Sequence, residues 1–243
     1  MRLLLLAGSG EGRQLAQALA KAEVPSVASL AGATRVPEAL PLPTRIGGFG
    51  GADGFTSYMR DEGITAVLDA THPFADQISQ RSAKICRDLD IPYLQFLRPA
   101  WRPVEGDRWT FLNSEEDAAR YIPEGSTVFI GSGRKTLAKF ANLEGRRLIV
   151  RQIDDPKEPF PFENGEFLVG RPPFSVTEEA DLFLKLGIDW LVVKNAGGST
   201  SRSKLDAARE LGIPVAMIRR PPQPEAPRVE TVTAAMNWVR SQM

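Results

Sequence analysis

The sequence has few of the residues that disulfides and metal sites need. Its 243 residues include one cysteine and one histidine. A single cysteine excludes an intrachain disulfide, and no zinc-type spacing of cysteine and histidine occurs. We therefore expect no bound metal. Cys86 falls in a helix-like run, SAKICRDL, and we expect a small buried core residue there, with a reactive thiol as the alternative.

The chain also lacks an excess of charge of either sign and lacks long apolar runs. It has 30 basic and 30 acidic residues, whereas a nucleic-acid-binding protein usually has a basic excess that neutralises phosphates. A local basic pocket for a small polyanion remains compatible with this balance. The opening run, MRLLLLA, is too short for a membrane helix or a signal segment. We expect no nucleic-acid or membrane partner and a cytoplasmic location.

Apolar runs that are typical of buried strands alternate with amphipathic runs that are typical of helices. Hydrophobic residues make up 42% and charged residues 25%, an ordinary globular balance. Strands that alternate with helices predict parallel sheets with right-handed crossovers. The expected strands are 3–7, 24–30, 64–70, 91–95, 127–130, 148–152, 190–194 and 214–218; the expected helices are 14–21, 54–61, 75–89, one from 135, 177–186, 204–211 and 226–243.

A proline-rich segment with little periodicity, residues 98–107, interrupts this alternation. We place a domain junction there, because the strand–helix pattern restarts after it. The predicted fold is α/β, with two Rossmann-like domains built on parallel sheets and a cleft between them. Residues 1–100 would form an N-terminal domain that binds NADPH. Residues 101–243 would form a C-terminal Rossmann-like domain that contributes to substrate binding.

A glycine-rich turn follows the first expected strand and leads into the first expected helix. Glycines there let the backbone approach a phosphate, and the helix N-terminus supplies unpaired N–H groups and a positive dipole. The third glycine falls one place earlier than in the usual dinucleotide fingerprint. A tight strand–helix turn without a ligand is the alternative. The residues expected to contact the cofactor here are Gly8, Ser9, Gly10, Glu11, Gly12 and Arg13.

The end of the second expected strand lacks the acidic residue that usually binds the ribose 2′-hydroxyl of NAD. The segment there contains Gly32, Thr34 and Arg35. A threonine and an arginine are suited to holding a 2′-phosphate, which favours NADPH over NADH. A solvated loop arginine is the alternative for Arg35.

The only histidine follows another expected strand, in the run DATHPFA (69–75). His72 lies at the carboxyl end of that strand, where active sites of open parallel sheets are found. We expect His72 and Thr71 to lie near the cofactor, and Thr71 to cap the next helix. A structural role for His72 is the alternative.

Two glycine-rich turns in the second half also follow expected strands. Gly131-Ser132-Gly133-Arg134 is one, and residues 194–200, KNAGGST, are the other. Glycines and small hydroxyl groups beside Lys194 and Lys204 indicate an anion-binding site. An exposed lysine at the start of a helix is the alternative for Lys204.

Together these motifs resemble the precorrin-6A reductase family through most of the chain. GGFGG, DATHPFA and KN-x-GG followed by KL-x-AAR, in this order, are specific to it. The similarity covers residues 8–13, 29–34, 45–51, 69–75, 98–101, 131–140, 170–174, 194–209 and 212–221.

The resemblance implies an oxidoreductase of cobalamin biosynthesis and tetrapyrrole metabolism. Members use NADPH to reduce a ring double bond of precorrin-6A, giving precorrin-6B, and some act on the cobalt-containing equivalent. The many carboxylates of this substrate require cationic partners. The residues expected to bind it are Arg45, Gly131, Ser132, Gly133, Arg134, Arg171, Lys194, Asn195, Gly197, Gly198, Ser199, Thr200 and Lys204.

The reaction needs a hydride from the cofactor and a proton delivered to the adjacent carbon. Lys204, His72 or water is the expected proton source. We favour Lys204, because a lysine near other cations loses its proton more easily. Three alternative functions are an NADPH reductase of another small anion, a nucleotide-sensing regulatory protein, and a two-domain tetrapyrrole cyclase that needs no nucleotide.

Overall fold

The computed structural model describes residues 1–32 and 39–243, and the chain divides into two compact units. The first unit comprises Met1–Pro99 together with Pro221–Met243, and the second comprises Ala100–Arg220. A boundary near residue 100 agrees with the expected junction. The expected assignment of the chain's last segment to the second domain is wrong, because residues 221–243 belong to the first unit.

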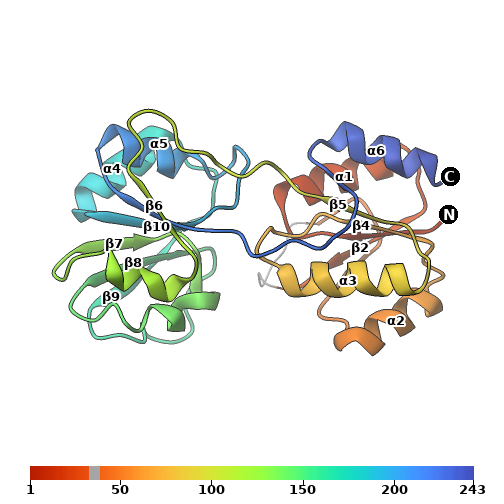
Figure 1. Ribbon diagram of the computed structural model, residues 1–243, viewed down its shortest axis with the longest axis horizontal. Helices are drawn as coiled ribbons and strands as arrows, with labels where there is room; N and C mark the ends of the chain where they lie inside the picture. The colour runs from red at the N-terminus through yellow and green to blue at the C-terminus, as the bar shows by residue number, and fades with distance from the viewer. Residues whose placement is uncertain (33–38) are drawn as a thin grey trace. The chain divides into compact units, whose positions relative to one another are not determined.

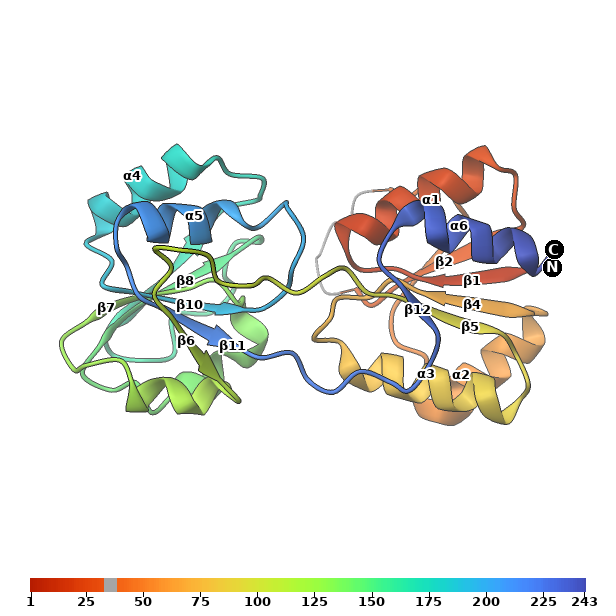
Figure 2. The same ribbon diagram turned by 45° about the horizontal axis from the view of Figure 1, so that its top comes forward.

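The sheet of the first unit is parallel throughout the part that the structure describes. Its strand order is β12-β5-β4-β1-β2-β3, and most of these strands are labelled in Figure 1 or Figure 2. This is the Rossmann order, with the first strand at the centre and the chain winding outward to both sides. The strands are β1 (Leu3–Leu6), β2 (Ser26–Leu30), β3 (Thr44–Ile46), β4 (Ala66–Asp69), β5 (Tyr93–Phe96) and β12 (Arg228–Val229).

Helices cover both faces of this sheet (Figure 2). On one face lie α1 (Gly10–Lys21) and α6 (Val232–Ser241), and on the other lie α2 (Gly51–Asp61) and α3 (Asp76–Asp88). Alternate residues of β1 enter the two cores, Leu3 and Leu5 on the α1 side and Leu4 and Leu6 on the α2 side. Burial on both faces explains why this strand is a continuous apolar run.

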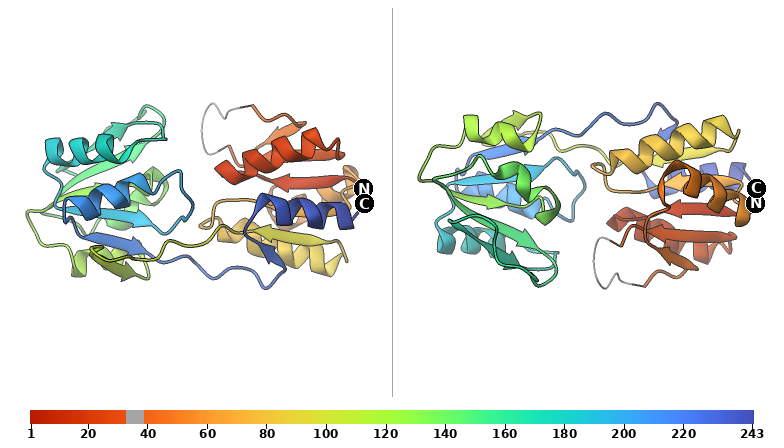
Figure 3. Two further views of the ribbon diagram at one scale, coloured as in Figure 1. Left: turned by 90° about the horizontal axis from the view of Figure 1, so that it is seen from above. Right: turned by 90° about the horizontal axis from the view of Figure 1, so that it is seen from below.

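The C-terminal segment returns to the first unit through two elements. Strand β12 pairs with β5 at the sheet edge, and α6 lies beside α1 (Figure 3). Met236 and Val239 are buried in the same core as Leu15 and Leu19 of α1. The helix expected from residue 226 begins only at Val232, because residues 228–229 are taken up by strand pairing.

The second unit has its own parallel sheet, with strand order β6-β11-β10-β7-β8-β9. The two six-stranded parallel sheets confirm the predicted α/β fold. The strands are β6 (Trp109–Leu112), β7 (Thr127–Ile130), β8 (Arg147–Gln152), β9 (Gly165–Val169), β10 (Trp190–Lys194) and β11 (Val215–Ile218). Strands β3, β6, β9 and β12 were not expected from the sequence.

The two faces of the second sheet are covered differently. Two α-helices, α4 (Val176–Leu186) and α5 (Ser203–Glu210), pack on one face through a core that includes Phe129 and Phe183. Short 3₁₀ helices, η1 (Glu115–Arg120) and η2 (Arg134–Phe140), contact each other elsewhere in the unit. The helix expected from residue 135 is therefore a 3₁₀ helix.

Two predictions from composition can be compared with the structure. Cys86 is fully buried in the core between the first sheet and helices α2 and α3, which confirms its expected core role. Among the described residues, no helix combines the length and apolar character that crossing a bilayer requires.

Candidate active site

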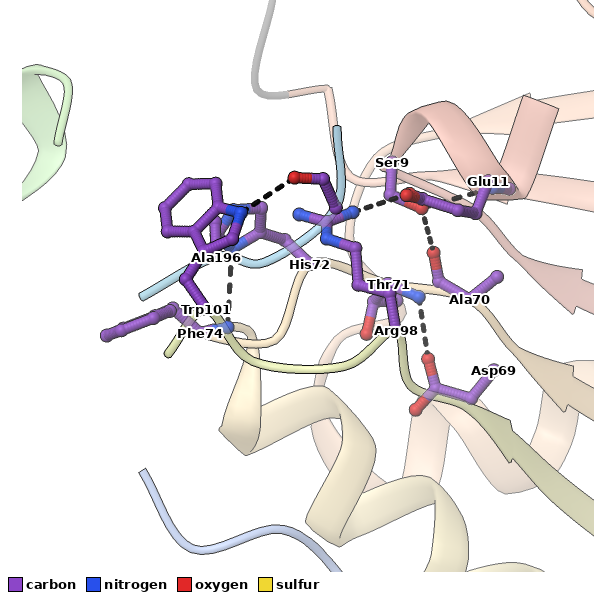
Figure 4. Close-up of polar contacts among 12 residues, drawn as sticks. Ser9, Glu11, Asp69, Ala70, Thr71, His72, Phe74, Arg98, Trp101 and Ala196 are labelled. Carbon is purple, nitrogen blue, oxygen red and sulfur yellow. Dashed lines mark hydrogen bonds and ion pairs between the residues drawn. The ribbon is translucent and has the colours of Figure 1, made fainter. Parts of the chain in front are cut away.

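The turn between β1 and α1 is built around Ser9 (Figure 4). Ser9 is the N-cap of α1: its Oγ accepts a hydrogen bond from Gly12 N at 3.0 Å and donates one to Ala70 O at 2.9 Å. A Cβ on Gly12 would lie 3.3 Å from Ala7 and from Ala70 O, so Gly12 lets the helix pack closely on the strands. A Cβ on Gly10 would meet nothing within 4 Å. The surface over Gly10 is therefore open to a ligand.

The first turn of α1 carries an acidic side chain whose charge is compensated. Glu11 forms an ion pair with Arg98 at 2.5 Å, and both side chains are mostly buried (Figure 4). A free carboxylate at this position would repel a phosphate that approached the helix N-terminus. The ion pair removes most of this repulsion. Arg13, also in the first turns of α1, is exposed.

A buried carboxylate organises the loop that contains the histidine. Asp69, which is 1% exposed, accepts hydrogen bonds from Tyr93 Oη at 2.6 Å and from Thr71 N at 2.9 Å. Burial and the nearby Asp69 carboxylate raise the pKa of Tyr93, so this hydroxyl remains a donor. Neither Asp69 nor Tyr93 was expected at the site, although an acid inside a buried apolar run was a usable signal.

Thr71 and His72 follow directly at the carboxyl end of β4. The Thr71 hydroxyl lies 3.2 Å from Ser79 Oγ and does not cap α3, whose N-cap is Ala75. The expected capping role of Thr71 is therefore wrong. His72 Nδ1 accepts a hydrogen bond from Phe74 N at 3.3 Å, which leaves Nε2 to carry the proton of the neutral ring.

The region after β2 is described only in part. Gly32 lies beside Ile46, and Thr34 and Arg35 lie outside the described residues. Arg45 lies on β3, directly opposite Ser29 of β2. The structure therefore places Arg45 in the first unit, whereas the other residues expected to bind the substrate lie in the second.

Lys204 is a buried lysine at the start of α5, with 9% of its surface exposed. Its alternative assignment as an exposed residue is wrong. Its ammonium donates to Ser201 O at 2.8 Å, and its methylene groups would lie 3.4–3.5 Å from a Cβ on Gly131. Burial lowers the pKa of Lys204 to about 8; Glu179 opposes this shift and Arg151 adds to it.

A buried ion pair lies close enough to affect this lysine. Arg151 and Glu179 form two parallel hydrogen bonds of 2.7 and 2.5 Å, and Glu179 is 1% exposed. The Arg151 guanidinium carbon also lies 4.7 Å from the centre of the Phe129 ring and 4.3 Å from the centre of the Phe174 ring. This bidentate geometry satisfies both charges in a largely dry environment. Neither residue was expected at the site from the sequence.

Polar groups from adjacent strands meet at the carboxyl end of the second sheet. Lys194 lies 3.3 Å from Glu115 Oε1 and donates to Thr136 Oγ1 at 3.2 Å. Burial by itself would raise the pKa of the Glu115 carboxyl. The hydrogen bond from its own backbone N–H and the charge of Lys194 outweigh burial, so the pKa lies below its usual value. The Ser132 hydroxyl and the Gln152 amide are buried without a hydrogen-bond partner among the described residues.

The loop after β10 is fixed by internal hydrogen bonds. The Asn195 amide accepts from Trp101 N at 2.8 Å and donates to Trp101 O at 3.0 Å, and Trp101 Nε1 donates to Gly198 O at 2.7 Å. Gly197 and Gly198 both have positive φ, a backbone conformation that favours glycine. The side-chain amide of Asn195, which we expected to contact substrate, thus holds the shape of the loop. Four other residues expected to bind the substrate are exposed: Arg134, Arg171, Ser199 and Thr200.

Strand order and glycine turns at the carboxyl ends of β1 and β7 define a Rossmann-like α/β protein with two sheets. A family model described as "Precorrin-6x reductase CbiJ/CobK" matches residues 2–240, and the chain belongs to this family. This confirms the resemblance noted from the sequence.

Two curated relatives and one solved structure illustrate the similarity. The chain is 44% identical to a precorrin-6A reductase of Rhodococcus erythropolis over 98% of this chain and 97% of the relative. It is 38% identical to one of Rhodobacter capsulatus over 98% and 95%. A solved structure of "CobK precorrin-6A reductase" superposes with a TM-score of 0.95 at 37% identity, covering 100% of this chain and 97% of the other.

Proposed function

We propose that this protein is a precorrin-6A reductase of cobalamin biosynthesis, which uses NADPH to reduce a ring double bond and form precorrin-6B. The observation that carries the proposal is the nearly full-length identity of 37–44% to relatives with this name. Relatives named cobalt-precorrin-6A reductases are 25–28% identical. This difference favours the cobalt-free ring, with the cobalt-containing ring as the alternative substrate.

The residues of the first unit fit a dinucleotide. Helix α1 has 12 residues, and the N–H groups of Gly10 and Glu11 lack intrahelical partners because they lie in its first turn. The open surface over Gly10 admits a pyrophosphate, and Arg98 compensates the charge of Glu11. Gly8, Ser9 and Gly10 would hold the pyrophosphate, with Thr71 and His72 nearer the nicotinamide end.

When bound, NADPH supplies the hydride for the ring carbon. The chain supplies the proton and holds the substrate's carboxylates. Lys204 is the favoured proton source, since a pKa of about 8 keeps it protonated at neutral pH while making it a better acid than an ordinary lysine. Arg134, Arg171 and Lys194 are the proposed carboxylate partners.

Turnover tests the reaction directly. The purified protein, mixed with precorrin-6A and NADPH, should consume NADPH at 340 nm in step with a change in the absorption spectrum of the macrocycle. Gly10→Val should abolish NADPH binding yet keep the fold, because its side chain enters open surface. Gly12→Ala is the matched control for a change in the same turn that affects packing. It should lower the melting temperature, because its Cβ would contact Ala7 and Ala70. NADPH-independent loss of precorrin-6A, or turnover retained in Gly10→Val, would contradict the proposal.

Three variants separate the possible proton sources. Lys204→Ala should leave NADPH affinity within about twofold while turnover falls much further. If Lys204 donates the proton, Lys204→Arg is also slow, because arginine does not release a proton at neutral pH. If Lys204 only pairs with a carboxylate, Lys204→Arg keeps much of the rate and the loss appears in KM. His72→Asn tests the other residue, and full activity of Lys204→Ala would exclude both roles for the lysine.

A further inference from the structure

Arg45 lies where a Rossmann-type sheet meets the ribose of a bound dinucleotide. It is paired in register with Ser29 on β2, and Gly47 N continues the ladder by donating to Leu30 O at 2.8 Å. Arg45 is therefore beside the carboxyl end of the second strand. In this sheet order, that strand end faces the 2′ position of the adenosine ribose.

The guanidinium of Arg45 is held rigidly by neutral groups. Its Nη1 donates to Ser29 Oγ at 2.8 Å and to Gly47 O at 2.9 Å, and its Nη2 donates to Gly48 O at 2.9 Å. Its flat face lies 3.9 Å from the centre of the Phe49 ring. These contacts fix the orientation of the group before any ligand binds.

This positive charge has no counter-ion in the part of the chain that the structure describes. Among the described residues, its hydrogen-bond acceptors are hydroxyl or carbonyl oxygens, and no ion pair with a carboxylate is formed. Contacts with described residues use three of its five N–H groups, and the Nε–H and one Nη2–H remain for another acceptor. A preoriented guanidinium with free donors is suited to an oxyanion, above all a phosphate.

The described residues around Arg45 leave room for a nucleoside. Cβ atoms built on Gly47, Gly48 and Gly50 would meet nothing within 4 Å. Ile46, the next residue on β3, is 59% exposed. Its Cγ2 would lie 3.4 Å from a Cβ on Gly32, just after the end of β2. An exposed aliphatic side chain at this strand end offers an apolar surface for a purine base.

We propose that Arg45, supported by Ser29, binds the ribose 2′-phosphate of NADPH and thereby selects NADPH over NADH. This inference rests on the proposed function, since it assigns a role within the same cofactor site. It replaces the expectation that Arg45 binds a substrate carboxylate. A contact from Arg35 to the same phosphate would increase the preference for NADPH. The proposed contact from Arg45 does not depend on Arg35.

The test compares four ligands by isothermal titration calorimetry: NADPH, NADH, adenosine 2′,5′-bisphosphate and 5′-AMP. Arg45→Gln should weaken NADPH and the bisphosphate tenfold or more while changing NADH and 5′-AMP by less than twofold. Arg45→Lys, which keeps the charge and most of the stem, should give a smaller loss that is again confined to the two ligands with a 2′-phosphate. Arg60→Gln, at an exposed arginine of α2, is the control for charge and should change none of the four.

The outcomes separate this inference from the proposed function. Equal losses for NADPH and NADH, or no loss for either, would overturn it. A raised KM for precorrin-6A with an unchanged NADPH-to-NADH preference would also overturn it, in favour of a substrate carboxylate. Arg45-dependent binding of the bisphosphate without turnover of precorrin-6A would support the phosphate site and refute the proposed reaction. Absence of binding to all four ligands would refute both.

Discussion

Replacing Lys204 with methionine tests how strongly its burial disfavours the charge. The side chain is 9% exposed, and burial lowers its pKa from 10.5 to about 8. Each pKa unit corresponds to about 1.4 kcal/mol, so the protonated lysine destabilises the folded state by roughly 3 kcal/mol at pH 7. Methionine keeps the apolar stem without the charge. Losing the hydrogen bond to Ser201 O offsets about 1 kcal/mol of the gain.

The pH dependence of this effect has a definite sign. Between pH 8 and 10.5 the unfolded chain binds the Lys204 proton and the folded chain releases it, so the stability of the wild-type protein rises with pH in this window. The methionine variant lacks this term. Its advantage over the wild type should therefore be largest below pH 8 and shrink by about 2 kcal/mol between pH 8 and pH 9.5.

Urea denaturation at pH 7, 8 and 9.5 measures the difference. Three of the four tryptophans, Trp101, Trp109 and Trp190, lie in the second unit, so their fluorescence reports mainly on its unfolding. Lys185→Met, at an exposed lysine in the last turn of α4, is the control and should give a difference that does not vary with pH. A Lys204→Met difference that stays constant from pH 8 to 9.5 would refute the depressed pKa.

Three further substitutions test buried polar groups, each by chemical or thermal denaturation. Arg151→Met leaves the Glu179 carboxylate buried and unpaired and should destabilise the second unit by about 3–5 kcal/mol. The double variant Arg151→Met/Glu179→Leu should recover most of that stability. Strictly additive losses in the double variant would contradict the pairing. Tyr93→Phe removes a hydrogen bond to the buried Asp69 and should cost about 1.5–3 kcal/mol, so an unchanged melting temperature would argue against that contact. Gln152→Met removes a buried amide without a partner among the described residues and should stabilise by about 1 kcal/mol; a loss of stability would show that the amide is hydrogen-bonded in solution.

The central strands could be predicted from the sequence, and the edge strands could not. Strands such as β1 and β10 are buried on both faces and form continuous apolar runs. Strand β3 has three partly or wholly exposed residues, and β9 is also incompletely buried. Edge strands have weak patterns because only part of each strand contacts the core.

The candidate site was predictable where it follows strand ends and unpredictable where it depends on distant pairs. The turn at Gly8–Arg13 could be placed because a glycine run directly follows an apolar strand. The pairs Asp69–Tyr93 and Arg151–Glu179 join residues 24 and 28 positions apart, so no local pattern indicates that they meet. Arg45 could be recognised as a cation, but its position beside β2 depends on the pairing of β2 with β3.

The return of the C-terminal segment affects how the first unit is completed. Without β12, the outer edge of β5 would lack its strand partner, and without α6 the apolar groups of α1 that pack on Met236 and Val239 would be less covered. Residues 1–99 therefore lack one edge strand and one covering helix of their own unit. Because the missing elements follow the whole second unit in sequence, the first sheet reaches its full hydrogen bonding only after the last residues of the chain have joined it. The turn at Gly8–Arg13 follows the central strand β1, and the buried Asp69 is the last residue of the neighbouring strand β4, away from the β12 edge. Strand β1 thus pairs with β2 and β4 and not with the C-terminal segment, whereas α1, which contains Gly10–Arg13, relies on α6 for part of its packing.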